Sequence, residues 1–141
     1  MKKRVIRFTV IIIVLALMLS MAAFASMEAS HYLTYYNAYI SRSGNTVKVN
    51  FEVVGTGVMD SIGATEIYLY EKTSAYGSWT PVQTYLSTDP AYASIMIDTN
   101  AGGYDNYVTY SGNSSYQYKA YVTIYAEKDG GSDSRNLVVY S

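Results

Sequence analysis

Apolar and polar side chains alternate with a period of two along most of the chain beyond residue 30. In residues 46–54, the odd-numbered positions from 47 to 53 are apolar, whereas Lys48, Asn50 and Glu52 between them are polar. This alternation is typical of a strand with one face in the core and one in water. Because no stretch beyond residue 25 has a sustained apolar period of 3.6, the sequence predicts an all-β fold.

Glycine, asparagine and proline clusters predict turns between the alternating runs. Gly55-Thr56-Gly57 predicts a break after residue 54, and Gly102-Gly103 predicts a loop over 100–105. The predicted strands are 32–40, 46–54, 65–72, 79–85, 92–98, 116–127 and 136–140, with a minor strand over 107–110. About seven strands in so short a domain indicate a single antiparallel β-sandwich of the immunoglobulin-like or fibronectin type III-like kind. Such folds bond a tyrosine hydroxyl of the sixth strand to the backbone just upstream, a role for Tyr116 or Tyr118.

The first 25 residues have the order of a secretory signal peptide. Basic residues at positions 2, 3, 4 and 7 precede an apolar run over 8–19, and Ala23-Phe24-Ala25 supplies the small residues of a cleavage site. We expect a helical signal peptide over 1–25, cleaved between Ala25 and Ser26, and one β-sandwich domain over 26–141. The alternative is an uncleaved anchor, since the apolar run approaches the roughly 20 residues that span a bilayer. After cleavage the protein would be secreted, with no remaining attachment to a membrane.

Cleavage changes the charge of the chain. The whole sequence has a formal charge of −1, but the leader holds four of the ten basic residues and none of the eleven acidic ones. The mature chain therefore has six basic against eleven acidic residues, a net charge of −5. This balance argues against nucleic acid and anionic lipid as partners, because binding to phosphates depends on lysine and arginine. Without cysteine, the stability of the exported domain must come from packing of its core.

Candidate catalytic and metal-binding residues are few. His31 is the only histidine and cysteine is absent, which excludes a zinc site built from those ligands. The segment 129–133 has two aspartates, but it is short of the six to eight oxygens that calcium prefers, so we expect a polar turn. We predict a non-enzyme without cofactor or metal. A small secreted glycan hydrolase that uses Glu66 and Glu127 is the less favoured alternative.

Tyrosine is the most distinctive feature of the composition. All 17 tyrosines lie beyond residue 31, where only four leucines occur, so several tyrosines must be exposed. In an immunoglobulin-like sandwich the third and sixth strands are neighbours. This arrangement would gather the candidate ligand-binding residues on one outer face: Glu66, Tyr68, Tyr70, Tyr121, Thr123 and Tyr125.

Such a face could recognise an extracellular protein or glycan, because tyrosine presents a rigid apolar body with a hydrogen-bonding tip. Alternatively, the tyrosines form cross-strand pairs that stabilise the sheet without any partner. A different class of function is a structural or self-associating extracellular protein that uses the same face or an edge strand. The composition leaves the ligand and the oligomeric state open.

Several segments resemble those of small secreted proteins of unknown function from Gram-positive anaerobic bacteria. These segments are GTGVMDSIGATEIYLYE (55–71), DPAYA (89–93), VTYSG (108–112), YVTIYA (121–126) and GGSDSR (130–135). The resemblance spans nearly the whole mature domain and implies export and a shared fold, but no activity. Residues 118–134 are also similar to the sixth strand, hairpin and start of the seventh strand in fibronectin type III domains.

Overall fold

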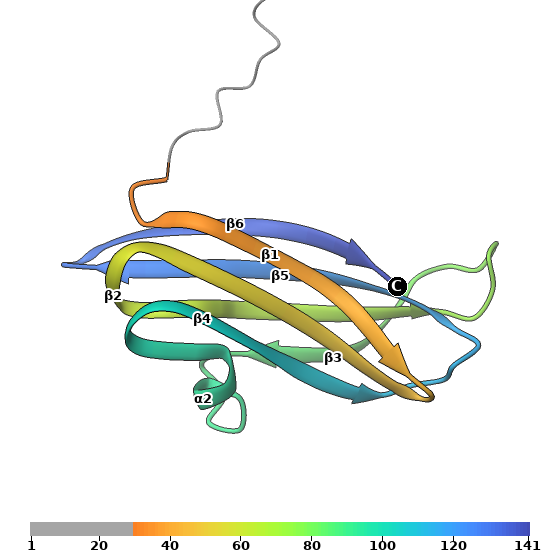
Figure 1. Cartoon of the computed structure of the whole chain (residues 1–141). Helices are drawn as coiled ribbons and strands as arrows, with labels where there is room; N and C mark the ends of the chain where they lie inside the picture. The colour runs from red at the N-terminus through yellow and green to blue at the C-terminus, as the bar shows by residue number, and fades with distance from the viewer. Residues whose placement is uncertain (1–29) are drawn as a thin grey trace, which may run out of the picture.

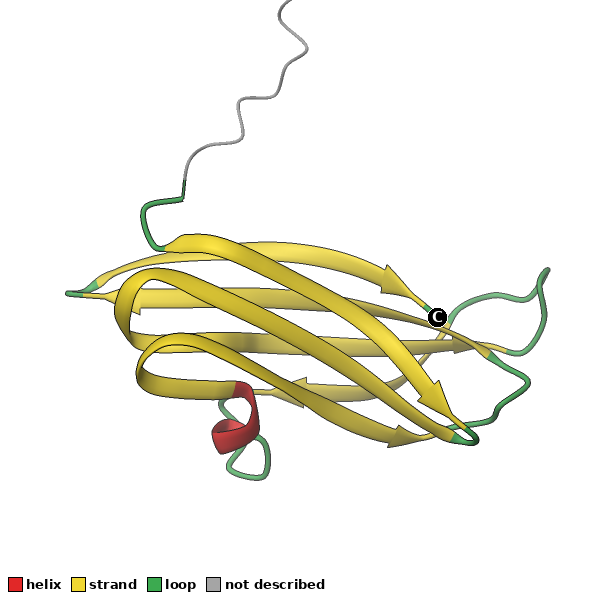
Figure 2. Cartoon of the chain, in the orientation of Figure 1, coloured by secondary structure: helices red, strands yellow, loops and turns green. Residues whose placement is uncertain are grey.

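The computed structural model describes residues 30–141 (Figure 1). The predicted signal peptide over 1–25, its helix and its cleavage site at Ala25 and Ser26 lie outside the described residues. Within them the chain is all-β, with one four-residue helix (Figure 2). No helix in this part of the chain is long and apolar enough to cross a membrane. The elements are β1 (Leu33–Ser43), β2 (Thr46–Lys72), β3 (Thr80–Leu86), α2 (Ala93–Met96), β4 (Ile97–Ser111), β5 (Gln117–Lys128) and β6 (Gly131–Tyr140).

The strands form one antiparallel sheet that curls around its longest member, the 27-residue β2. The first half of β2 pairs with β1 on one side and with the second half of β4 on the other. Its second half pairs with β5 and β3, and β6 adds to β5. The sheet therefore has two limbs, visible in Figure 1: a first limb of β1, β2 and β4, and a second limb of β6, β5, β2 and β3.

Glycines allow β2 to turn from one limb into the other. The pairing of β2 with β4 shifts register between Val54 and Met59, where Gly55 and Gly57 lie. Gly63 has a φ of +150°, and a Cβ there would collide with the backbone carbonyl of Met96. The bend therefore needs glycine both for its backbone angle and for the close approach of the segment around α2.

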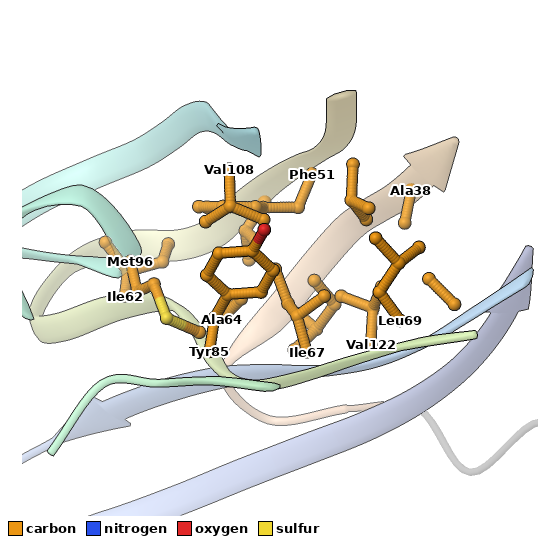
Figure 3. Close-up of a cluster of buried hydrophobic side chains, with 14 of the residues drawn as sticks. Ala38, Phe51, Ile62, Ala64, Ile67, Leu69, Tyr85, Met96, Val108 and Val122 are labelled. Carbon is orange, nitrogen blue, oxygen red and sulfur yellow. The ribbon is translucent and has the colours of Figure 1, made fainter. Parts of the chain in front are cut away.

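The hydrophobic core lies between the two limbs (Figure 3). It receives the alternate residues predicted to be apolar, including Val47, Val49, Phe51 and Val53 of the first limb. Ile67, Leu69, Val122 and Ile124 face them from the second limb and are at most 1% exposed. Among residues 30–141, no polar or charged residue is buried. The period-two pattern of the sequence thus corresponds to one shared core.

The all-β class and the antiparallel arrangement are confirmed, and the described residues form six strands where the sequence predicted about seven. Residues 46–54 and 65–72 belong to the single strand β2, because Gly55 and Gly57 bend the strand without ending it. Residues 93–96, predicted as part of a strand over 92–98, form α2 instead. The predicted loop over 100–105 lies within β4, which follows β2 around the same bend.

Candidate binding face

The pairing of β2 with β5 places the predicted site residues of these strands side by side. Tyr68 lies opposite Tyr121, Tyr70 opposite Lys119, and Glu66 opposite Thr123. Directly opposed residues of an antiparallel pair point to the same face of the sheet. We call this outer surface of the second limb the tyrosine face; it comprises Glu66, Tyr68, Tyr70, Lys119, Tyr121 and Thr123, with Val138 and Tyr140 of β6.

Tyrosines on this face are open to solvent because their neighbours in sequence fill the core. Tyr68 is 36% exposed and Tyr121 is 41% exposed, whereas Leu69 and Ala120 beside them are fully buried. β6 extends the same surface, since Val138 lies opposite Tyr121. An exposed cross-strand row of apolar side chains therefore runs from β6 to β2.

Tyr125 is the predicted site residue that lies apart from the others. It is opposite Gly63, close to the bend of β2. Its hydroxyl donates a hydrogen bond of 2.7 Å to Oε2 of Glu127. Burial, followed by this hydrogen bond, raises the pKa of the Tyr125 hydroxyl. Tyr125 is thus half-buried and engaged within the sheet, and it does not line the depression formed by the remaining residues.

That depression is open and has a volume of about 420 Å³. The rings of Tyr68, Tyr70 and Tyr121 contribute to its wall, together with Glu66, Val122, Thr123 and Asn136. The Thr123 hydroxyl donates a hydrogen bond of 3.0 Å to Oδ1 of Asn136. An apolar wall thus lies beside a carboxylate, a hydroxyl and an amide, which are groups able to bond to a polar ligand.

Asn136 was not among the residues predicted from the sequence. The turn at Asp129 and Gly130 pairs Lys128 with Gly131, and this register places Asn136 opposite Thr123. A two-residue hairpin fixes the register of both its strands. The Asp129-Gly130 pair in the sequence could therefore have predicted the position of Asn136 opposite Thr123.

Aromatic contacts hold one end of the tyrosine face together. The rings of Tyr70 and Tyr121 meet edge to face, with centroids 5.6 Å apart. The Lys119 ammonium lies 5.0 Å from the ring centroids of Tyr70, Tyr121 and Trp79. Trp79 also packs against Tyr140, at 6.1 Å between centroids. These contacts restrict the rings and hold this end of the tyrosine face in place.

The two carboxylates considered for glycoside hydrolysis do not share the depression. Glu66 lies opposite Thr123, whereas Glu127 is four residues farther along β5 and opposite Ser61. Four residues of a strand span roughly 13 Å, which exceeds the separation of about 5 to 9.5 Å between paired catalytic carboxyls. Within the described part of the chain, no three acidic or histidine side chains gather as metal ligands.

A second group of exposed tyrosines lies on the outer face of the first limb. Tyr39 and Tyr107 flank a hollow of about 320 Å³, together with Glu52 and Asp105. The Lys48 ammonium lies 4.2 Å from the ring centroid of Tyr107. The excess of tyrosine therefore covers both outer surfaces, whereas the sequence had predicted one.

A third hollow, of about 540 Å³, is lined by residues of β3 and β4 together with Tyr92 and Ile95. The Tyr85 hydroxyl crosses this opening and donates a hydrogen bond of 2.7 Å to the carbonyl oxygen of Thr109. The Tyr85 ring also meets Tyr92 edge to face, at 5.0 Å between centroids. Side chains of the protein itself therefore bridge and partly fill this side of the core.

No protein-family model and no curated protein matches the chain. Among solved structures, the sporulation control protein Spo0M from Bacillus subtilis is similar over 74% of this chain and 48% of its own, with 9% identity and a TM-score of 0.38. A family 76 glycoside hydrolase from a bovine Bacteroides thetaiotaomicron strain is similar over 79% of this chain and 20% of its own, with 12% identity and a TM-score of 0.32. The chain thus spans about half of one protein and a fifth of the other. At these TM-scores, the likeness assigns neither a family nor a function.

Proposed function

We propose that this protein is a secreted, non-enzymatic binding module whose tyrosine face contacts an extracellular glycan or protein. Export is inferred from the composition of residues 1–25. Within the same proposal, the two limbs form an immunoglobulin-like or fibronectin type III-like sandwich, and the chain belongs with the small secreted proteins that it resembles. The Tyr118 hydroxyl supports the sandwich, because it bonds to the backbone of Asn113 just upstream, as expected for such folds.

The observation that carries the proposal is the position of Tyr68 opposite Tyr121 at an open depression lined by Glu66, Thr123 and Asn136. Tyr68 and Tyr121 are 36% and 41% exposed, so the sheet forgoes only a part of the roughly 1.5 to 3 kcal/mol that full burial of a large apolar side chain contributes. A partner that covers the rings would recover that part. The neighbouring carboxylate and amide could bond to hydroxyl groups, so the lining favours a glycan.

Stabilisation of the sheet by the same rings is the competing explanation. The contact between Tyr70 and Tyr121 contributes in that way whether or not a partner binds. Tyr68 makes no aromatic ring contact within residues 30–141, but it lies directly opposite Tyr121, and such a cross-strand pair stabilises a sheet. The two explanations differ in one outcome: only recognition predicts that a folded Tyr68→Ala/Tyr121→Ala variant loses binding.

The proposal is tested by screening the chain from Ser26 onward against a glycan array, cell-wall preparations and mucin. Trp79 is the only tryptophan, and it lies beside Lys119 at the end of the tyrosine face, so its fluorescence reports a ligand that reaches this surface. We expect a change in the fluorescence of Trp79 on binding, and loss of binding in a Tyr68→Ala/Tyr121→Ala variant that remains folded. Full binding by this variant would assign recognition to another surface.

A further inference from the structure

β6 is an edge strand of the sheet, and β1 contacts it without pairing with it. β6 pairs with β5 alone, so its other side has no strand partner within the described residues. The backbone nitrogen of Ser141 donates a hydrogen bond of 3.0 Å to the carbonyl oxygen of Tyr118. Successive residues of an antiparallel strand direct their backbone N–H and C=O groups to opposite sides. Val139 and Leu137, like Ser141, therefore direct theirs towards β5. Asn136, Val138 and Tyr140 direct theirs away from the sheet.

Side chains cap the edges on the opposite side of the molecule. On β3, the Gln83 amide donates a hydrogen bond of 3.2 Å to the Thr84 carbonyl oxygen, and Pro81 has no N–H to offer. On β4, Oδ1 of Asn106 accepts from the Tyr107 N–H at 2.9 Å. The Thr109 carbonyl on the same strand accepts from Tyr85. These bonds occupy backbone groups that another strand would otherwise use.

The first half of β6 is protected in a similar way, but its second half is not. Arg135 donates a hydrogen bond of 2.9 Å to the Ser134 carbonyl oxygen and pairs with Asp133. From residue 30 to residue 141, no side chain bonds to the outward backbone groups of Asn136, Val138 or Tyr140. Residues 136–140 also contain no charge, proline or glycine. This segment has the features of an edge that accepts another strand.

We propose that residues 136–140 of β6 pair with the same residues of a second copy, antiparallel, around a two-fold axis at Val138. In this register Val138 lies opposite the partner's Val138, and Asn136 lies opposite the partner's Tyr140. A two-fold axis brings the central residue against its own copy, so an uncharged centre avoids repulsion between like charges. Asp133 and Arg135 fall outside the paired segment.

The choice of a second copy, rather than a foreign strand, follows from this self-complementarity. Val138 and Tyr140 are 46% and 63% exposed, and both belong to the tyrosine face. Pairing would therefore join the tyrosine faces of two copies into one surface with two depressions. That consequence rests on the proposed function, whereas the pairing of the strands does not.

Sedimentation equilibrium of the chain from Ser26 onward tests the pairing, because this chain contains all described residues and the whole core. We expect a mass that rises from one to two protomers with concentration. Val138→Lys places two like charges at the axis and should weaken the dimer at least tenfold. Thr84→Lys is the matched control, because Val138, Tyr121, Tyr68 and Thr84 form one cross-strand row with Val138 and Thr84 at its two ends. The control should dimerise like the wild type.

A cysteine substitution tests the register directly, because the chain contains no cysteine. Opposed residues of a hydrogen-bonded antiparallel pair have Cα atoms about 5.5 Å apart, within the range that a disulfide bridges. Mild oxidation should link Val138→Cys into a covalent dimer and leave Thr84→Cys monomeric. A wild type that is monomeric at all concentrations, a Val138→Lys variant that dimerises normally, or a mass that grows beyond two protomers would overturn the proposal. None of these results depends on ligand binding, so failure here and failure of the proposed function are distinguishable.

Discussion

The Tyr118 hydroxyl lies 2.6 Å from the backbone nitrogen of Asn113 and 3.1 Å from its carbonyl oxygen. It accepts a hydrogen bond from the first group and donates one to the second, while its ring is completely buried. One side chain of β5 thereby fixes the turn that leads into its own strand. A Cβ at Gly112 would collide with this hydroxyl, so the turn and the tyrosine are matched.

Tyr118→Phe should lower the free energy of unfolding by about 1 to 3 kcal/mol, because the Asn113 N–H loses its partner in a partly buried position. The measurement is urea unfolding at neutral pH. Tyr121→Phe is the control: its hydroxyl is at the exposed surface, and its removal should change the free energy by less than about 0.5 kcal/mol. Equal effects of the two substitutions would show that the bonds to Asn113 contribute nothing specific.

Tyr85 should make the fold sensitive to alkali. Burial first, and the neighbouring Tyr92 and Tyr110 next, raise the pKa of Tyr85 above its usual value of 10.0. Its stabilising contribution is therefore complete below about pH 10 and is lost as the pH rises towards the folded-state pKa, because the unfolded chain releases this proton first. Tyr85→Phe should cost about 1 kcal/mol at pH 7 through the lost bond to Thr109, and its stability should fall less steeply above about pH 10.

The dependence on pH is measured by urea unfolding at a series of pH values. Tyr76→Phe is the matched control, because Tyr76 is fully exposed and its loss should leave the slope of the wild type unchanged. A Tyr85→Phe variant with the slope of the wild type would exclude Tyr85 as the group responsible.

Gly63→Ala should destabilise the protein by more than about 2 kcal/mol, because the backbone angle and the Met96 carbonyl both oppose a Cβ. Gly130→Ala provides the comparison. Gly130 also has a positive φ, of +78°, but no atom lies within 4 Å of the added Cβ, so the cost should be only about 1 kcal/mol. Thermal unfolding followed by circular dichroism compares the two. Similar losses would mean that the contact with Met96 relaxes easily.

Glu52 and Asp105 lie directly opposite each other on β2 and β4, whereas the ion pair found within residues 30–141 joins Arg135 and Asp133. Opposed like charges destabilise a sheet, so Glu52→Gln should raise the free energy of unfolding by about 0.2 to 1 kcal/mol. The gain should shrink in high salt, which screens exposed charges. Glu66→Gln is the control, since Glu66 faces the neutral Thr123. A gain that is independent of salt would point to a cause other than charge repulsion.

Alternation alone was sufficient to predict the class of the fold and the inward residues of β2 and β5, because a strand buried on one face repeats every two residues. It could not predict that β2 continues through Gly55 and Gly57, because glycine both ends and bends strands. The alternation over 92–98 was similarly ambiguous, since so short an apolar run fits either a strand or a helical turn. In the structure, residues 93–96 form a helical turn, and the backbone of Met96 packs closely against Gly63.

The candidate site was predictable where it depended on neighbouring strands. The placement of Tyr68 beside Tyr121 followed from the expected adjacency of their strands, and the structure shows it. Tyr125 lies apart because it is four residues beyond Tyr121 on β5, where it is opposite Gly63 near the bend of β2, and the sequence did not predict that bend. The second group of tyrosines was missed because the side chains of residues 32–40 alternate between two tyrosine-bearing faces.

The central claim is that the tyrosine face recognises a partner and does more than stabilise the sheet. The most direct test measures both the dissociation constant for a bound glycan or cell-wall preparation and the free energy of unfolding in two paired variants. Tyr68→Ala/Tyr121→Ala alters the tyrosine face, and Tyr39→Ala/Tyr107→Ala removes two exposed tyrosines from the other outer face. We predict that both pairs lose stability to a similar extent, while only the first loses binding. Equal binding by the two variants, or no binding by the wild type to any preparation, would contradict the account.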